Sequence, residues 1–180
     1  MIPVRAMSTD ELGARRLRQL RTLFDAAWGD EPEAFTEQDW EHAMGGVHFL
    51  AEEGREILSH ASVVERAIEA DGHPLATGYV EAVATLPAHQ RRGLGSAVMR
   101  AVGEHIDRGF ELGALDTGVA PFYERLGWIR WEGPTYVRTE SGPVRTPDDD
   151  GAVMVRPTPR TPELDLAGPI SCEWRPGDVW

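Results

Sequence analysis

The sequence contains no lysine, a single cysteine and no long apolar run. All 18 of its basic residues are arginines, against 30 aspartates and glutamates, which gives a formal net charge of −12. Affinity for nucleic acid depends mainly on cationic contacts to phosphates, so a chain with this balance is a poor nucleic-acid binder. We therefore expect no nucleic-acid partner.

The scarcity of cysteine and of apolar runs excludes further classes of protein. Cys172 is the only cysteine, so no internal disulfide framework is expected, and we interpret it as a packed small side chain. No apolar stretch reaches the roughly 20 residues that a membrane-spanning helix needs, and residues 1–5 do not begin a secretory signal. The six histidines show no metal-ligand spacing, so no metal is expected. These absences predict a cytoplasmic protein with no membrane partner.

The order of the expected elements indicates one α/β domain over residues 1–180. Apolar residues recur at helical spacing as far as Trp28, and a capping box at Thr36 and Asp39 predicts a second, short helix over residues 36–44. Three strands that can pair antiparallel follow, and then strand, helix, strand, helix and strand, which together predict a mixed sheet. The expected strands are residues 47–51, 57–68, 78–85, 111–115 and 152–155, and the later helices are residues 94–108 and 119–128.

Charge is unevenly distributed along the chain. Residues 28–56 carry nine acidic side chains and one arginine, whereas residues 89–108 carry four arginines and two acids. A basic region suits an anionic cofactor, and the acidic segment suits a cationic second substrate. The alternative for the acidic segment is a surface that only keeps the protein soluble.

Residues 78–96 combine a strand, a turn and the start of a helix. Glu81 lies within an otherwise apolar strand, where burying an unpaired carboxylate is costly. The turn reads Gln90-x-x-Gly93-x-Gly95, and a glycine turn that opens a helix aims backbone N–H groups and the helix dipole at one point. Arg91 and Arg92 add positive charge. This stretch predicts an anion site, the alternatives being a plain connection for the turn and a structural ion pair for Glu81.

These motifs resemble those of the GNAT acyltransferases. The turn matches the acetyl-CoA motif of that family, and residues 122–128, Phe-Tyr-Glu-Arg-Leu-Gly-Trp, are similar to its second hallmark, a tyrosine-bearing helix that ends in Leu-Gly followed by Phe or Trp. The resemblance implies the GNAT fold, in which helices flank a mixed, mostly antiparallel central sheet that is splayed at its middle. It also implies acetyl-CoA as cosubstrate.

The resemblance assigns roles to individual residues. Glu81 would be the general base that deprotonates an amine, the backbone N–H of Val83 would polarise the thioester, and Tyr123 would protonate the departing thiolate. The alternative for Tyr123 is a helix residue that only packs on the sheet. The residues implied to bind the cofactor are Val83, Ala84, Thr85, Gln90, Arg91, Arg92, Gly93, Leu94, Gly95 and Ser96.

Three acidic segments narrow the resemblance to the aminoglycoside 2'-N-acetyltransferases, which confer antibiotic resistance. They are residues 35–42, 145–151 and 174–180. The residues implied to line the aminoglycoside site are Asp30, Asp39, Glu81, Ala82, Asp116, Asp148, Asp149, Asp178 and Trp180 with its terminal carboxylate.

The chain departs from this group at two places. Residues 31–34 look like a short insertion that leaves the position of Asp30 open. Asp116 stands where serine is more usual, and it either contacts an amine or caps the next helix. A homodimer is expected.

Two alternatives to this function remain. One is a GNAT enzyme that acts on another polyamine or on a cell-envelope aminosugar, and the other is a non-catalytic module that binds acyl-CoA. The presence of both Glu81 and Tyr123 argues against the binding module.

Overall fold

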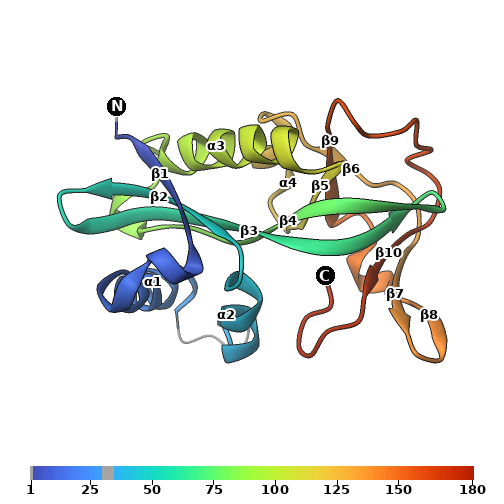
Figure 1. The fold of residues 1–180 in the computed structure, drawn as a ribbon, viewed down its shortest axis with the longest axis horizontal. Coiled ribbons are helices and arrows are strands. Elements are labelled where there is room, and N and C mark those ends of the chain that lie inside the picture. The colour runs from blue at the N-terminus through green and yellow to red at the C-terminus, as the bar shows by residue number, and fades with distance from the viewer. Residues whose placement is uncertain (1, 30–34) are drawn as a thin grey trace. The chain divides into compact units, whose positions relative to one another are not determined.

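The computed structural model describes residues 2–29 and 35–180 (Figure 1). They form two compact units, the first made of Met1–Val64 and Val80–Val102, the second of Glu65–Tyr79 and Gly103–Trp180. Three regular elements contribute residues to both units: β3 (Glu56–Ala70), β4 (His73–Thr85) and α3 (Leu94–Gly109). The expectation of one domain over residues 1–180 stays a prediction.

The first unit is a set of antiparallel strands with helices on both faces. β1 (Val4–Ser8) pairs with β2 (Val47–Glu53), and β2 pairs with the first part of β3. α1 (Gly13–Trp28) and α2 (Glu37–Ala43) lie on one face of these strands, and the first half of α3 lies on the other (Figure 1). The capping box expected at the start of α2 is present, with Thr36 as the N-cap.

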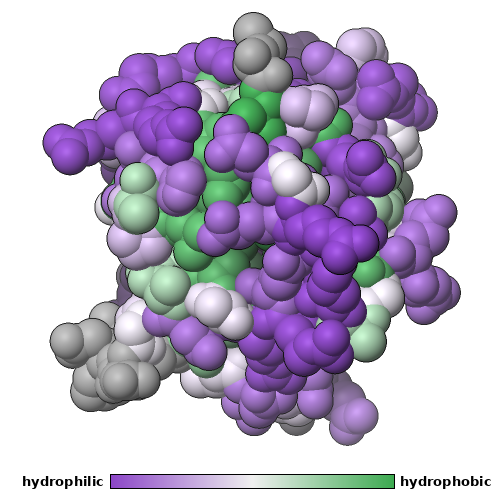
Figure 2. Space-filling model, turned by 90° about the vertical axis from the view of Figure 1, so that its left-hand side faces the viewer, coloured by the Kyte–Doolittle hydropathy of each residue, from purple (hydrophilic) through white to green (hydrophobic). Residues whose placement is uncertain are grey.

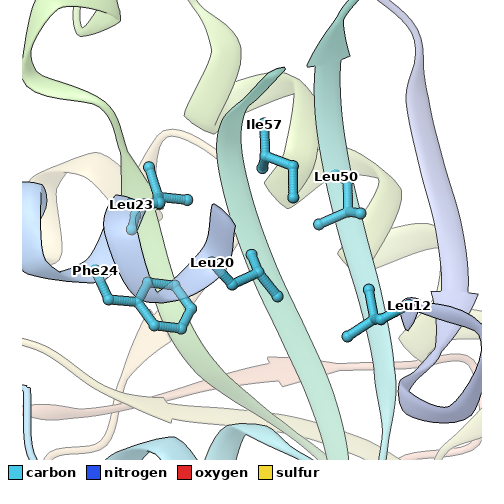
Figure 3. Packing of buried hydrophobic residues seen from close by; sticks show 7 residues of the cluster. Leu12, Leu20, Leu23, Phe24, Leu50 and Ile57 are labelled. Carbon is cyan, nitrogen blue, oxygen red and sulfur yellow. The ribbon is translucent and has the colours of Figure 1, made fainter. Parts of the chain in front are cut away.

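The core beneath α1 follows from the spacing of its apolar residues. Leu20, Leu23 and Phe24 recur at intervals of three to four residues, so they occupy one stripe of the helix. Figure 3 shows this stripe facing Leu50 of β2 and Ile57 of β3, and all five side chains are at most 3% exposed. This packing fixes α1 against the strands.

The second unit contains the remaining strands. β4 runs parallel to β5 (Leu112–Asp116) over Thr77–Tyr79, and β5 pairs antiparallel with β9 (Val153–Pro157). The end of β3 pairs antiparallel with β10 (Ile170–Glu173), which is parallel to β7. The other elements of this unit are α4 (Ala120–Glu124), β6 (Ile129–Arg130), β7 (Thr135–Thr139) and β8 (Gly142–Arg145).

The structure confirms the predicted α/β fold with a mixed, mostly antiparallel sheet flanked by helices, and it corrects several details. The predictions missed β1, β6, β7, β8 and β10, none of which exceeds five residues. The helix expected over residues 119–128 ends at Glu124, because the chain turns through Gly127, whose φ of 88° is left-handed. The splay of the central sheet stays a prediction.

The surface that Figure 2 presents is mainly hydrophilic, with a band of hydrophobic residues running through it. Within residues 2–29 and 35–180, no helix is long and apolar enough to cross a membrane.

Candidate active site

Strand β4 is irregular at the residues expected to bind the thioester. Ala82 has a φ of 50°, in the left-handed region that residues other than glycine rarely adopt. Glu81, Ala82 and Val83 are all half-buried, whereas the preceding residues Gly78 to Val80 are buried. The strand expected over residues 78–85 is present and begins five residues earlier, at His73. The Glu81 side chain is thus half-buried, directly after the buried residues Gly78 to Val80.

Side chains of β3 hold the carbonyl groups of this irregular segment. His60 Nδ1 lies 2.8 Å from Ala82 O, and Ser59 Oγ donates to Ala84 O at 2.9 Å. Ser62 Oγ donates to Glu81 O over a longer distance, 3.4 Å. All three β3 side chains are fully buried. Sequence reasoning missed them, although the run Ser-His-Ala-Ser inside an apolar strand was the signal.

Two histidines continue this network away from β4. His48 Nδ1 lies 2.9 Å from His60 Nε2, and Thr9 Oγ1 lies 2.8 Å from His48 Nε2. Burial lowers the pKa of His48 to about 4. Burial, with the neighbouring His48 as a smaller cause, lowers the pKa of His60 to about 3. Both rings are therefore neutral at pH 7.

The glycine turn leads directly into α3. Arg91 and Gly93 both have left-handed φ, 59° and 80°. The bond from Ala97 N–H to Gly93 O is 3.0 Å long, so the amides of the three residues between them precede the helical ladder. These residues are Leu94, Gly95 and Ser96.

The turn combines positive charge with a hollow in the surface beside it. Arg91, Arg92 and Gly93 are exposed, and Arg92 Nη1 lies 2.7 Å from His89 Nδ1. A hollow of about 280 Å³ opens beside the start of α3. Its lining consists of Ile2, Glu53, Arg92, Gly93, Leu94 and Ala97. The turn is thus an exposed, positively charged helix start of the kind that binds anions.

In the second unit, Tyr123 of α4 lies in a protected environment. Its side chain is 6% exposed, and burial raises the pKa of its phenol to about 12, while a hydrogen bond with the Thr117 side chain acts in the opposite direction. The phenol is therefore protonated at neutral pH. Thr117 Oγ1 also accepts from Val119 N–H at the start of α4, and Asp116 is exposed at the end of β5.

Three of the expected substrate residues lie close together in the second unit. The pKa of Asp149 is raised, first by burial and then by repulsion from Asp178, Asp148 and Asp150. Asp150 differs from its neighbour, because Arg145 Nη2 donates to its carboxylate at 2.6 Å and Thr135 N–H donates at 3.0 Å. These bonds lower the pKa of Asp150 below its usual value.

The residues after β10 pack against this acidic group. The indole of Trp180 is 3% exposed and donates to Thr146 Oγ1 at 3.0 Å. Arg175 donates to main-chain oxygens of Asp178 and Trp180 at 2.7 and 2.8 Å. Trp174, in contrast, is 59% exposed. The main-chain oxygen of Trp180 therefore already has a cationic partner.

The expected residues divide between the two units. The first holds Glu81 to Thr85, the turn from Gln90 to Ser96, and Asp39, whose carboxylate accepts from Thr36 in the capping box. The second holds Asp116, Tyr123, Asp148, Asp149, Asp178 and Trp180. Asp30 lies outside the described residues. Among residues 2–29 and 35–180, no His, Cys, Asp and Glu side chains form a group able to hold a metal ion.

One sequence relative and two solved structures that this chain resembles are all acetyltransferases. The chain is 41% identical over 174 residues to an aminoglycoside 2'-N-acetyltransferase of Mycolicibacterium fortuitum, covering 93% of this chain and 84% of that protein. Its fold is similar to the GNAT family N-acetyltransferase YhbS of Escherichia coli, solved with CoA, with a TM-score of 0.65 and 12% identity over 94% of this chain and 88% of that one.

A second solved structure has the same fold. It is a GNAT family acetyltransferase of Brucella melitensis in complex with acetyl-CoA, with a TM-score of 0.58 and 15% identity over 92% of this chain and 95% of that one. Residues 8–130 match the family model described as an acetyltransferase (GNAT) domain. The chain is an enzyme that belongs to the GNAT family of acetyltransferases.

Proposed function

We propose that the enzyme transfers the acetyl group of acetyl-CoA to the 2'-amine of aminoglycosides and so confers resistance to them. The observation that carries this proposal is the 41% identity, over 93% of the chain, to a protein named for that activity. The clustered carboxylates Asp148, Asp149 and Asp178 support a polycationic substrate, since each charge-assisted hydrogen bond to an ammonium group contributes about 1.5–3 kcal/mol.

Acetyl-CoA would bind at the glycine turn. Leu94, Gly95 and Ser96 offer amides that precede the helical ladder, and Arg91 and Arg92 offer exposed guanidinium groups. Together these groups suit the two negative phosphates of a pyrophosphate. Gln90 contributes the first position of the motif, and the pantetheine arm would lie along Val83, Ala84 and Thr85 of β4. The two GNAT structures solved with CoA and acetyl-CoA support this cosubstrate.

Transfer would be direct. An ammonium group cannot attack, so Glu81 first takes a proton from it, either directly or through water. The amine nitrogen then attacks the thioester carbonyl carbon, and the developing negative charge on oxygen is stabilised by the Val83 N–H. The C–N bond forms, the C–S bond breaks, and the thiolate takes a proton from Tyr123. The nitrogen loses its second proton as the amide forms, and this proton returns to the tyrosinate through water, so Tyr123 is restored while Glu81 keeps the first proton and releases it to solvent. The raised pKa of Tyr123 supports this role, since the phenol still carries its proton at neutral pH.

The substrate site would combine backbone and carboxylates. Ala82 lies beside Glu81 and would contact the substrate there, and the acidic residues would bind the amines that do not react. The residues proposed to contact the aminoglycoside are Asp30, Asp39, Glu81, Ala82, Asp116, Asp148, Asp149, Asp178 and Trp180. A homodimer and a cytoplasmic location stay predictions.

A matched pair of antibiotics tests the proposal. Kanamycin B carries an amine at position 2' and kanamycin A carries a hydroxyl there, with the remaining structure shared. We expect acetyl-CoA-dependent turnover of kanamycin B and none of kanamycin A, with the product located by NMR. Equal turnover of both would place the reaction at another amine. Turnover of neither, with polyamines or aminosugars accepted instead, would identify a different GNAT substrate, and no turnover of any amine would indicate a binding module.

A further inference from the structure

A chain of hydrogen bonds through the interior of the first unit ends on one peptide group of β4. It joins Gly45 N–H to Thr9 Oγ1 at 2.9 Å, Thr9 to His48 at 2.8 Å, His48 to His60 at 2.9 Å, and His60 to Ala82 O at 2.8 Å. The two imidazoles come from different strands, β2 and β3, and both are fully buried. None of the roles assigned above uses this chain.

The direction of every bond in the chain follows from its last member. A carbonyl oxygen has no proton, so His60 Nδ1 must carry the hydrogen and donate to Ala82 O. A neutral imidazole has only one N–H, so His60 Nε2 accepts, and His48 Nδ1 must be its donor. His48 Nε2 then accepts from the Thr9 hydroxyl, which itself accepts from Gly45 N–H. All the donors point toward β4, and aligned bonds of this kind polarise and strengthen one another.

Burial of the two imidazoles keeps this chain of hydrogen bonds in one donor–acceptor arrangement. The pKa values of about 4 and about 3 leave both imidazoles neutral, each with the one proton that the chain requires. A second proton on either ring would need a new acceptor in a region closed to water. The orientation is therefore maintained at the pH of the cell.

The peptide group at the end of the chain is the one that contains the Val83 N–H. Peptide groups are planar and trans, so the C=O of residue 82 and the N–H of residue 83 point in opposite directions. Because Ala82 O is held by His60 on β3, the Val83 N–H must point away from His60. This matters most beside a left-handed residue, since Ala82 has a φ of 50° and backbone in such regions persists only where its surroundings fix it.

We propose that His60, oriented by His48 and Thr9, is a positioning residue that aims the Val83 N–H at the thioester carbonyl. The inference rests on the proposed function, in which that N–H stabilises the oxyanion. His60 itself touches neither substrate nor cofactor in this account, and it acts only through the peptide group. The alternative is that the buried histidines only contribute stability.

Two substitutions at one position separate these roles. His60→Asn places an amide nitrogen where Nδ1 stands and keeps the donor to Ala82 O, but it leaves the His48 N–H without its acceptor. His60→Phe keeps the ring shape and removes both partners. Both variants are expected to lower the melting temperature, because each leaves a buried polar group unpaired. Only His60→Phe removes the hydrogen bond that holds Ala82 O and thereby orients the peptide group of residues 82 and 83.

We expect His60→Phe to lower kcat by about tenfold to a hundredfold, since losing an oxyanion donor outright costs about 10²–10³. His60→Asn should stay within about threefold of the unsubstituted enzyme, because the anchored N–H is retained. The dissociation constant of CoA, which has no acetyl carbonyl, checks that the cofactor site of each variant is intact. An equal loss of kcat in both variants, or no loss in either, would overturn the inference.

The carbonyl stretch of bound acetyl-CoA, labelled with ¹³C and recorded by infrared spectroscopy, reads the donor directly. In the unsubstituted enzyme and in His60→Asn the band should lie at lower frequency than in free acetyl-CoA, and in His60→Phe it should move back toward the free value. If the unsubstituted enzyme shows no shift, the role of Val83 in the proposed function is wrong. If that shift is present and His60→Phe retains it, only the inference about His60 is wrong.

Discussion

The buried histidines and the clustered aspartates are two polar groups that differ in charge, in burial and in how their polar atoms are paired. His48 and His60 are neutral, fully buried and hydrogen-bonded at each ring nitrogen. Asp148 and Asp178 are exposed and Asp149 is half-buried, and the pKa of Asp149 is raised first by its burial and then by repulsion from the neighbouring carboxylates. The histidines find their hydrogen-bond partners within the protein. The aspartates instead repel one another, which makes their close placement electrostatically unfavourable.

This difference indicates what each group is for. A fully satisfied buried network fixes one backbone geometry, because any rearrangement leaves a polar atom unpaired. A set of repelling carboxylates is stabilised by an added cation, so it favours binding. In the proposed enzyme the first group orients the chemistry and the second recognises the polyamine. The four predictions below test this division, in order of decreasing effect.

Glu81→Gln tests the proposed general base, which directly precedes Ala82, the residue whose carbonyl is held by the histidine network. We expect kcat to fall by roughly 10²–10⁴-fold, because the amide cannot accept the proton of the substrate ammonium group. The CoA dissociation constant should be unchanged. Glu65→Gln, an exposed carboxylate of β3, is the control and should retain its activity. Near-normal turnover by Glu81→Gln at all pH values would mean that another group is the base.

Gly93→Val tests whether the first unit also fixes the cofactor turn through its backbone. Gly93 has a φ of 80°, a conformation that costs a residue with a Cβ about 1–2 kcal/mol, so CoA affinity should fall roughly tenfold. Gly109, at the end of α3, also has open space around it but no left-handed φ, so Gly109→Val is the matched control. Isothermal titration with CoA measures both. Equal affinities in the two variants would refute a cofactor role for the turn.

Asp149→Asn tests whether the charge of Asp149 lowers the stability of the fold at neutral pH. Asp150→Asn, at the adjacent residue, serves as the comparison because the pKa of Asp150 is shifted in the opposite direction. The pKa of Asp149 is raised on folding, so the stability linked to it is greatest at low pH and is lost as pH rises through the folded pKa. At pH 7 the asparagine should therefore raise the melting temperature. It should also raise the aminoglycoside KM about tenfold, because an ammonium loses a charged partner.

Asp150→Asn should do the reverse. Its pKa is lowered by Arg145 and Thr135, so its contribution to stability is present above the unfolded pKa and is lost as pH falls. At pH 7 the substitution should lower the melting temperature and change the aminoglycoside KM less than Asp149→Asn does. Melting curves from pH 3 to pH 8 decide between the two signs. The comparison fails if both aspartates respond in the same direction.

Trp174→Ala should have the smallest effect. This side chain is 59% exposed, and surface substitutions usually change stability by less than about 0.5 kcal/mol. Trp180→Ala, at a side chain that is 3% exposed, should cost about 3–5 kcal/mol. Chemical denaturation of both variants measures the difference. A large loss in Trp174→Ala would mean that its indole is covered in solution.

Elements rich in apolar residues were predictable from the sequence, including the five-residue strands β5 and β9, whereas strands that are shorter or more polar were not. α1 and the strands from β2 to β5 carry enough apolar residues for their spacing to be read. β1 and β8 have four or five residues with arginines among them, and they are strands only because a neighbour supplies hydrogen bonds. Pairing across the chain is not visible in a local window.

The candidate site divides in the same way. The glycine turn and Glu81 were visible because glycines at fixed spacing and a carboxylate in an apolar strand break local patterns. The histidine network was not predictable because its members lie in three separate segments, and no local spacing connects Thr9, His48 and His60. The left-handed Ala82 carries no sequence signal, since alanine has no preference for that conformation.

The ion pairs of this protein also have a chemical consequence. The cations that hold Glu52, Asp107 and Asp150 are all guanidinium groups, and the chain has no lysine. A guanidinium stays protonated at any physiological pH and is a poor nucleophile. A lysine amine, by contrast, can be acylated by a thioester without any catalyst. Because all its basic side chains other than histidine are arginines, this acetyltransferase presents no side-chain amine to its own acyl donor. Uncatalysed acetylation therefore does not remove the positive charges that form its ion pairs.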